Sequence, residues 1–259
     1  MDPLRSDDAG PVADARDLDW DGCFNVRDLG GLAAAGGRRT RWGAVVRSDG
    51  VSRLTAAGWS AVQAHGIGTV VDLRNDDEIG QDTAPRPAGL TTVRVPLDDR
   101  ADTRLWTYLA RNRLEGSPLY YRPFMERKAD RCAAVISAIG RAAPGGVLVH
   151  CRVGRDRTGL ISVLLLALAG VGPGDIAADY EISTQRMAGL SAAVGDPDPG
   201  PMIRDILAGK GTTVRDAVLD TLAWLDVEAL LASGGLSAAD MAAVRDRLLE
   251  PGGPRPAAG

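Results

Sequence analysis

Short runs of apolar, β-branched residues alternate with longer helical patterns in the N-terminal part of the chain, and this alternation constrains the fold most strongly. Strands are predicted at 43–48, 68–73, 91–95 and 147–150. The run at 68–73 is apolar on both faces, as expected for a parallel strand covered by helices on both sides. The pattern predicts an α/β fold with a central, mostly parallel sheet flanked by helices.

Helical patterns occupy the intervals and then the rest of the chain. Thr55 is a suitable N-cap for a helix that runs to His65, and Gly66 is its predicted stop. Further helices are expected over 119–142, 158–169, 173–187, 214–231 and 237–249. The C-terminal third is therefore predicted to be all helical. The Gly and Pro residues at 195–201 predict a mobile excursion within it.

Length and composition fit one globular domain. The chain has 259 residues, of which 45% are hydrophobic and 25% charged. We expect a disordered N-terminus over 1–17, a single domain over 18–250 and a flexible tail over 251–259.

Charge and residue usage exclude several classes of function. The net charge of −4, without a long basic run, predicts no nucleic-acid partner. The longest apolar stretch, 160–171, is shorter than the roughly 18 residues of a membrane span, so no integral membrane association is expected. The acidic N-terminus has no signal-like apolar core, which predicts a cytoplasmic location and leaves nonclassical export open. Three cysteines and two histidines at unrelated spacings predict neither a disulfide framework nor a metal site.

The segment His150–Gly159 carries the predicted chemistry, because it joins a strand to an apolar helix. At such a junction the backbone N–H groups and the helix dipole bind an anion such as phosphate. Gly154 permits a tight turn, and the Arg157 guanidinium can hold two oxygens of the anion at once. The predicted phosphate-binding loop consists of Arg152, Val153, Gly154, Arg155, Asp156 and Arg157.

Cys151 lies at the start of this loop, where the same amides favour thiolate over thiol. A thiolate that faces phosphorus is a nucleophile, and this chemistry requires no metal or other cofactor. Thr158 is expected to donate its hydroxyl to the sulfur, and His150 to orient the loop from behind. Cys23 and Cys132 lack this context and are expected to have no role.

The segment His150–Gly159 resembles the phosphate-binding loop of the protein tyrosine phosphatase superfamily, in its bacterial branch of tyrosine and lipid phosphatases. Asn25–Gly31 is similar to that family's Asn-Phe-Arg-Asp-Leu-Gly-Gly signature, and Val70–Arg74 is similar to its second strand. Residues 178–180 and the terminal helix also resemble the family, so the resemblance covers about residues 20–249.

The resemblance implies a tyrosine phosphatase-like fold and hydrolysis of phosphomonoesters through a phosphocysteine. Cys151 would be the nucleophile, Arg157 would clamp the transition state, and Asp156 would be the acidic loop residue of this branch. The implied substrates are phosphoproteins, phosphoinositides or small phosphomonoesters, and residues 177–213 correspond to a helical lid. At Arg155 the sequence departs from the family, which commonly has a lysine linked to phosphoinositide substrates.

The leaving oxygen must receive a proton from an acid within hydrogen-bond reach. Asp156 is expected to be functionally necessary, and Asp98 or Asp99 to be the proton donor; the alternative for each is a solvated surface carboxylate. Arg27, Asp72 and Arg74 form either a supporting shell for the loop or internal ion pairs without a catalytic role.

Other functions share parts of this pattern. A small-molecule phosphatase acting on a nucleotide, a sugar phosphate or a biosynthetic intermediate would use the same loop chemistry. A non-catalytic phosphate-binding module would keep the loop without turnover, but the intact Cys151 and Arg157 favour an enzyme. A sulfurtransferase also uses a cysteine loop, although the Arg-Thr-Gly ending favours phosphate. The sequence makes no prediction of oligomeric state.

Overall fold

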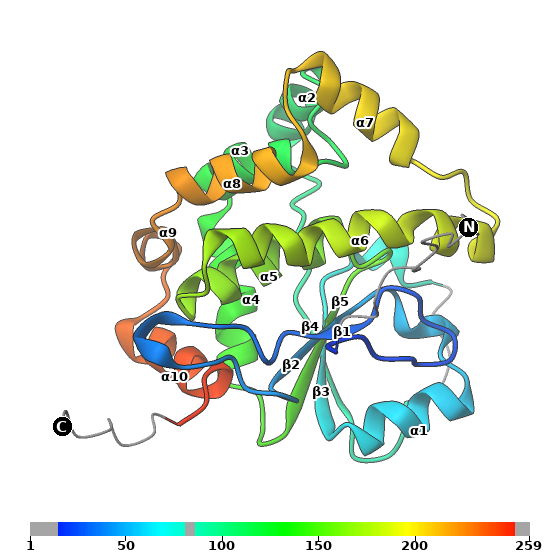
Figure 1. Ribbon diagram of the computed structural model, residues 1–259, viewed down its shortest axis with the longest axis vertical. Coiled ribbons are helices and arrows are strands. Elements are labelled where there is room, and N and C mark those ends of the chain that lie inside the picture. The colour runs from blue at the N-terminus through cyan, green and yellow to red at the C-terminus, as the bar shows by residue number, and fades with distance from the viewer. Residues whose placement is uncertain (1–14, 81–85, 252–259) are drawn as a thin grey trace, which may run out of the picture.

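The computed structural model describes residues 15–80 and 86–251. In this part of the chain, five strands form one sheet in the order β1-β2-β5-β3-β4 (Figure 1). The edge pair β1–β2 is antiparallel, and the other pairs are parallel. The strands are β1 (Arg27–Asp28), β2 (Val45–Ser48), β3 (Ile67–Asp72), β4 (Thr91–Arg94) and β5 (Gly146–His150). The α/β class and the mostly parallel sheet are thereby confirmed.

Helices cover both faces of the sheet (Figure 1). One face is covered by α1 and the other by α4 and α5, and α6 packs on α5 and α8. The helices are α1 (Ala56–Ala64), α2 (Thr103–Arg111), α3 (Tyr121–Arg127), α4 (Ala129–Gly140), α5 (Asp156–Leu168), α6 (Pro173–Val194), α7 (Gly200–Gly209), α8 (Val214–Trp224), α9 (Val227–Ser233) and α10 (Ala238–Leu248). The predicted helical C-terminal third is present.

Successive side chains of a strand point to opposite faces of the sheet, and this divides the hydrophobic core into two clusters. Val45, Val71 and Val149 point toward the cluster that contains α4 and α5. Their neighbours Val46 and Val70 point toward Trp59 and Val62 of α1. The buried strand β5 supplies residues to both clusters, which is why its sequence is continuously apolar.

Two long helices predicted from periodicity are each divided in the structure. The helix expected over 119–142 is interrupted at Lys128, whose backbone leaves the helical region and whose ammonium bonds Asp99 and Asp102, each at 2.8 Å. The helix expected over 214–231 is interrupted at Leu225, which is extended, and Asp226 caps the next helix by accepting from Ala229 N at 3.0 Å. The prediction of one continuous helix was wrong in both segments, because the spacing of apolar residues continues across the point where one helix ends and the next begins.

The segment 195–201 contains less irregular chain than expected. Helix α6 extends to Val194, and α7 already begins at Gly200, with Pro201 in its first turn. Ile203 and Leu207 of α7 pack against Ala217 of α8. The breaker residues therefore mark a short connection between two helices.

The ends of the chain are described only in part. Residues 1–14 and 252–259, on which most of the two terminal predictions fall, lie outside the described residues. In the described part of the N-terminal segment, Arg16 is buried and bonds Asp179 at 2.8 Å.

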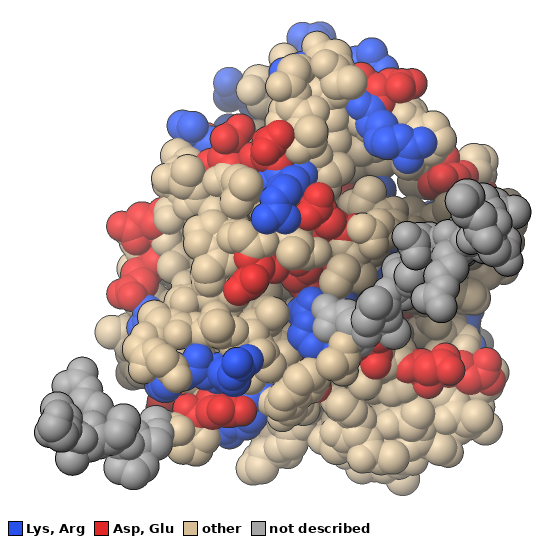
Figure 2. Space-filling view, viewed as in Figure 1, with Lys and Arg blue, Asp and Glu red and all other residues tan. Residues whose placement is uncertain are grey.

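Charged side chains are interspersed on the face shown in Figure 2, where no patch of one sign dominates. Among the described helices, none is both long and apolar enough to cross a membrane.

Candidate active site

The loop after β5 is held by hydrogen bonds to its carbonyl oxygens. The Gly50 N–H donates to Arg152 O at 2.9 Å, and the Asn25 amide donates to Val153 O at 3.1 Å. The Arg47 guanidinium donates to Gly154 O at 2.8 Å. These three bonds turn the carbonyls toward the scaffold, and a loop whose carbonyls are held in this way can direct N–H groups toward an anion.

Gly154 is required by this geometry. Its φ is +70°, and a Cβ at this position would lie 2.6 Å from Ser48 O, a backbone atom of β2. Any side chain here would push the loop away from the strand that supports it.

Cys151 is the first residue after β5, and its side chain is buried, with 1% exposure. His150 is also buried, and its Nδ1 lies 3.0 Å from Cys151 O, consistent with the expected position behind the loop. Burial lowers the pKa of His150, despite the nearby Asp72 carboxylate, so the ring is neutral near pH 7. The expected bond from Thr158 to the sulfur is not formed: Thr158 Oγ1 has no hydrogen-bond partner among the described residues.

Arg157 closes the loop and is held by Glu78, which the sequence analysis did not single out. Nη1 and Nη2 lie 2.5 and 2.6 Å from the two Glu78 oxygens, and Nη1 lies 3.5 Å from Asp98 Oδ2. Burial raises the pKa of Glu78, but the bonds from Arg157 outweigh this and hold it below its usual value. The guanidinium is therefore fixed at the site rather than free in solvent.

The two adjacent candidate acids lie in different environments. Asp98 is largely buried and faces Arg157, and Asn75 Nδ2 lies 3.5 Å from its Oδ2. Burial raises the pKa of Asp98 despite the opposing effect of Arg157. Asp99 instead bonds the Lys128 ammonium at 2.8 Å, and that bond lowers its pKa. Of these two acids, only Asp98 lies in ion-pair contact with an arginine of the loop.

Asp156 begins α5 and bonds Arg155 at 3.1 Å, within the loop itself. Its carbonyl accepts a hydrogen bond from the Tyr121 hydroxyl at 2.8 Å. Gly159, one turn later, leaves room for this contact, because a Cβ there would lie 2.6 Å from the Tyr121 hydroxyl.

The predicted supporting residues belong to two separate groups. Arg74 bonds Asp72 at 2.7 Å, and Asp72 lies 3.7 Å from His150 Nε2 at the neighbouring strand end. Arg27 bonds Asp179 of α6 at 2.9 Å, and Asp179 also bonds Arg47 at 2.6 Å. Because Arg47 holds the loop, the second group connects α6 to the phosphate loop.

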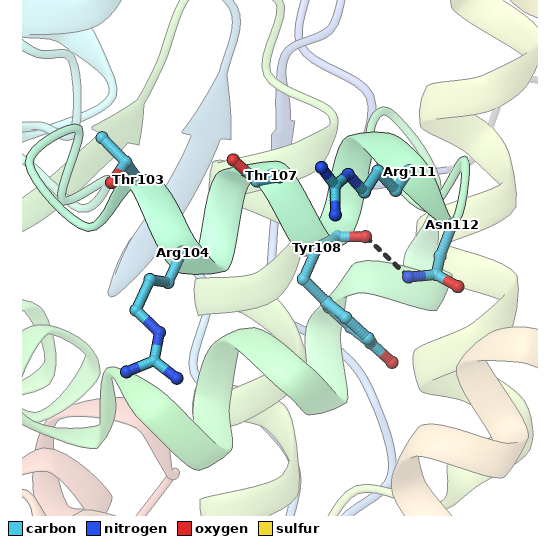
Figure 3. A pocket seen from close by; sticks show the side chains of 6 residues that line it. All are labelled: Thr103, Arg104, Thr107, Tyr108, Arg111 and Asn112. Atoms are coloured by element: carbon cyan, nitrogen blue, oxygen red, sulfur yellow. Dashed lines mark hydrogen bonds between the residues drawn. The ribbon is translucent and has the colours of Figure 1, made fainter.

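A cavity of about 960 Å³ opens beside the loop. It is lined by residues of the loop, of the turns after β2 and β3, of α6 and of the connection after α6, among them Arg53, Glu78, Arg152, Leu190 and Asp196. A smaller pocket of about 460 Å³ lies on α2 and is lined entirely by residues of that helix and its C-cap, Asn112 (Figure 3). It includes no residue of the loop, whereas the larger cavity is lined by Arg152 and Val153 of the loop and by Glu78, the partner of Arg157.

Glu78 and Arg47 were missed because neither spacing nor periodicity relates them to the loop, and Asp179 was noted only within the family-like segment 178–180, without a role. For Glu78 one signal existed. Strands β3 and β5 are parallel neighbours, with Asp72 opposite His150, so their carboxyl ends lie side by side. A carboxylate shortly after β3 must therefore lie near the loop after β5.

In the described residues, no three His, Cys, Asp or Glu side chains come together as metal ligands.

Residues 18–250 match the model of a family described as the tyrosine phosphatase family. A Cupriavidus necator protein named as a tyrosine-protein phosphatase is 37% identical over 70% of this chain and 67% of its own length. The triple specificity protein phosphatase PtpB of Mycobacterium tuberculosis is 29% identical over 68% of this chain and 72% of its own.

A tyrosine-protein phosphatase of Nostoc commune is 28% identical over 62% of this chain, which spans 58% of that protein. Among solved structures, P. aeruginosa TpbA bound to phosphotyrosine covers 74% of this chain and 86% of its own, with 15% identity and a TM-score of 0.36. A score this low adds nothing about function.

Proposed function

This chain belongs to the tyrosine phosphatase family, and from that membership we propose that it hydrolyses phosphomonoesters through a covalent phosphocysteine formed at Cys151. The family and the named relatives make it a phosphatase. The observation that supports the cysteine mechanism is the loop itself: its carbonyl oxygens are bonded to the scaffold, and Cys151 and Arg157 lie at its two ends.

In the first step, the Cys151 thiolate attacks phosphorus, and the bond from phosphorus to the ester oxygen breaks. The loop N–H groups and Arg157 stabilise the equatorial oxygens, where negative charge is spread in the transition state. Since Arg157 is already oriented by two bonds to Glu78, little reorganisation is required when the phosphate binds.

Asp98 is the proposed proton donor to the leaving oxygen. Its raised pKa keeps a larger protonated fraction than an ordinary aspartate has at the same pH, and its contact with Arg157 supports a position beside the bound phosphate. In the second step, water attacks the phosphocysteine, the Asp98 carboxylate accepts a proton from that water, and the sulfur leaves as thiolate. Inorganic phosphate is released, and both groups return to their initial states.

Phosphotyrosine is the proposed substrate type, with other phosphomonoesters accepted. The family membership supports this choice, and the relative from M. tuberculosis is itself named for triple specificity. A cytoplasmic location, a phosphorylated partner and a single domain over 18–250 are part of the same proposal.

The test is hydrolysis of p-nitrophenyl phosphate in EDTA and fresh dithiothreitol, with the wild type and Cys151→Ser compared. We expect EDTA-resistant turnover in the wild type and its loss in the variant, because a hydroxyl is a far weaker nucleophile than a thiolate. Cys132→Ser is the matched control, since Cys132 is buried in α4. Equal turnover by wild type and Cys151→Ser would exclude the cysteine mechanism.

A further inference from the structure

The two arginines that flank Val153 and Gly154 in the loop have opposite surroundings. Arg155 is 5% exposed, and it donates to Gly116 O at 2.8 Å and to Asp156 at 3.1 Å. The Arg152 side chain is 68% exposed and lines the cavity. The Arg155 guanidinium is therefore buried and hydrogen-bonded within the protein, whereas the Arg152 guanidinium is exposed and accessible to a ligand.

Arg53 joins Arg152 in the lining of the same cavity. It ends the short 3-10 helix Val51–Arg53, which follows the Gly50 N–H bonded to Arg152 O, so the two segments are fixed to each other. Arg53 bonds the buried Asp49 at 2.6 Å through Nη2, and its side chain remains one-third exposed. Asp49 thus fixes one terminal nitrogen of the Arg53 guanidinium, and the side chain as a whole still lines the cavity.

The remaining lining suits an aromatic phosphoester. Leu190 and Val194 of α6, together with Val153, give the cavity an apolar part. Three carboxylates also line the cavity: Glu78 is paired with Arg157, Asp196 is paired with Arg152, and Asp77 is exposed. The volume of about 960 Å³ lies near the upper end of the range for small-ligand sites, so it exceeds what one phosphate needs.

Resting on the proposed function, we propose that Arg53 and Arg152 form a second anion subsite, which binds an acidic side chain beside the phosphotyrosine of a phosphopeptide. Guanidinium groups bind carboxylates through paired hydrogen bonds, and a cavity wall strengthens them relative to bulk water. A phosphoinositide fits less well, because its second phosphate lies close to the first on one ring. That position calls for more than one cation within the loop beside Arg157, and since Arg155 bonds Gly116 O and Asp156, only Arg152 is left there.

Asp196 competes for this subsite. Its carboxylate lies 3.1 Å from Arg152 Nη2, and both side chains are more than half exposed. Exposed pairs of this kind contribute little, so an incoming carboxylate can displace Asp196.

The test measures kcat/KM for two phosphotyrosine peptides that differ only by Glu or Gln next to the phosphotyrosine, and takes their ratio. We expect the wild type to favour the Glu peptide by about twofold to fivefold at low salt, and this ratio to fall toward one as salt rises. Arg53→Gln, which keeps an amide near Asp49, should lower the ratio. Asp196→Asn, which frees Arg152, should raise it. Arg104→Gln on α2 is the matched control and should leave it unchanged.

Each outcome decides the proposal separately from the proposed function. The enzyme could hydrolyse both peptides with a ratio of kcat/KM near one that neither Arg53→Gln nor Asp196→Asn changes. That result would overturn the second subsite and leave the phosphatase mechanism intact. Failure to hydrolyse either peptide or p-nitrophenyl phosphate would overturn the proposed function itself. A soluble inositol bisphosphate is the third substrate. If the wild type hydrolysed it faster than the Glu peptide, and Arg53→Gln lowered its turnover, the assignment to a phosphopeptide would be overturned.

Discussion

At the scale of single residues, Glu78 controls how Arg157 is presented. Its two oxygens hold both terminal nitrogens of the guanidinium. We expect Glu78→Gln to lower kcat for p-nitrophenyl phosphate by about tenfold to a hundredfold, because one acceptor and the charge that fix the guanidinium are lost. Asp77→Asn removes the same charge from the adjacent residue and is the control. Equal kcat values for the two variants would show that Glu78 does not position Arg157.

Asp98 and Asp99 form a natural pair for testing the proton donor. We expect Asp98→Asn to lower kcat by about a hundredfold or more and Asp99→Asn to leave most of it, because only Asp98 faces Arg157. The pKa of Asp98 is raised by burial, so the protonated donor persists to higher pH than an ordinary aspartate allows.

The pH profile and the stability of Asp98→Asn follow from the same shift. The alkaline fall in kcat/KM should disappear in the variant. A carboxyl whose pKa is raised on folding stabilises the folded state when protonated, and this contribution is lost as pH rises through the folded-state pKa. Asp98→Asn should therefore raise Tm at pH 7, by about 1 to 3 °C. An unchanged alkaline limb would exclude Asp98 as the donor.

The sequence could predict which residues form the loop but only some of their partners. Cys151 and Arg157 follow from a local motif, since strand, loop and helix are contiguous. The choice between Asp98 and Asp99 could not be made, because adjacent residues of an irregular loop point in directions that only tertiary contacts determine. Arg47 lies within β2, and its role could not be predicted because its partner Asp179 lies on α6, far away in the sequence.

At the scale of elements, α6 has two ends with different constraints. Asp179 near its start is buried in bonds to arginines, whereas Val194 at its end is exposed and followed by Gly195 with φ of +73°. We propose that, of the lid expected over 177–213, only the part after Val194 moves as a lid. The first half of α6 is part of the scaffold.

Hydrogen exchange tests this division. Amides at 176–187 should exchange as slowly as those of α5, and amides at 195–213 at least about tenfold faster, because local opening there breaks few buried contacts. Peptides from α10 serve as an internal control for a peripheral helix. Equal protection of both halves would show that 177–213 moves as one unit or not at all.

Helix α2 shows why some elements escape prediction. Its buried residues are Leu105 and Leu109, only two positions at helical spacing, within a segment rich in arginine and threonine. Asp102 caps it by accepting from Leu105 N at 3.1 Å. The apolar residues lie on one face, but the helix has only nine residues and is polar on average, and the cap is recognisable only once the helix is known.

At the scale of the whole molecule, one carboxylate joins parts of the chain that are distant in sequence. Asp179 bonds Arg16 before the sheet, Arg27 of β1 and Arg47 of β2. Its pKa is held far below the usual range, because these arginines outweigh the effect of burial. The sequence shows one acidic residue within a helix and gives no sign that it balances three cations.

This network should make Asp179 a determinant of global stability. Removing one partner of a buried ionic group leaves uncompensated charge, so Asp179→Asn should lower the free energy of unfolding by about 3 to 5 kcal/mol in urea at pH 7. Asp205→Asn, on the exposed face of α7, is the control and should change it by less than about 0.5 kcal/mol.

The pH dependence of that difference identifies its origin. A carboxyl with a depressed folded-state pKa contributes stability above its unfolded pKa of about 3.9 and loses it as pH falls toward the folded value. The gap between wild type and Asp179→Asn should therefore be constant from about pH 5 to 7 and shrink below about pH 4. Because Arg47 also holds Gly154 O, kcat should fall with stability in this variant. A gap that persists unchanged to the lowest pH would assign the loss to packing rather than charge.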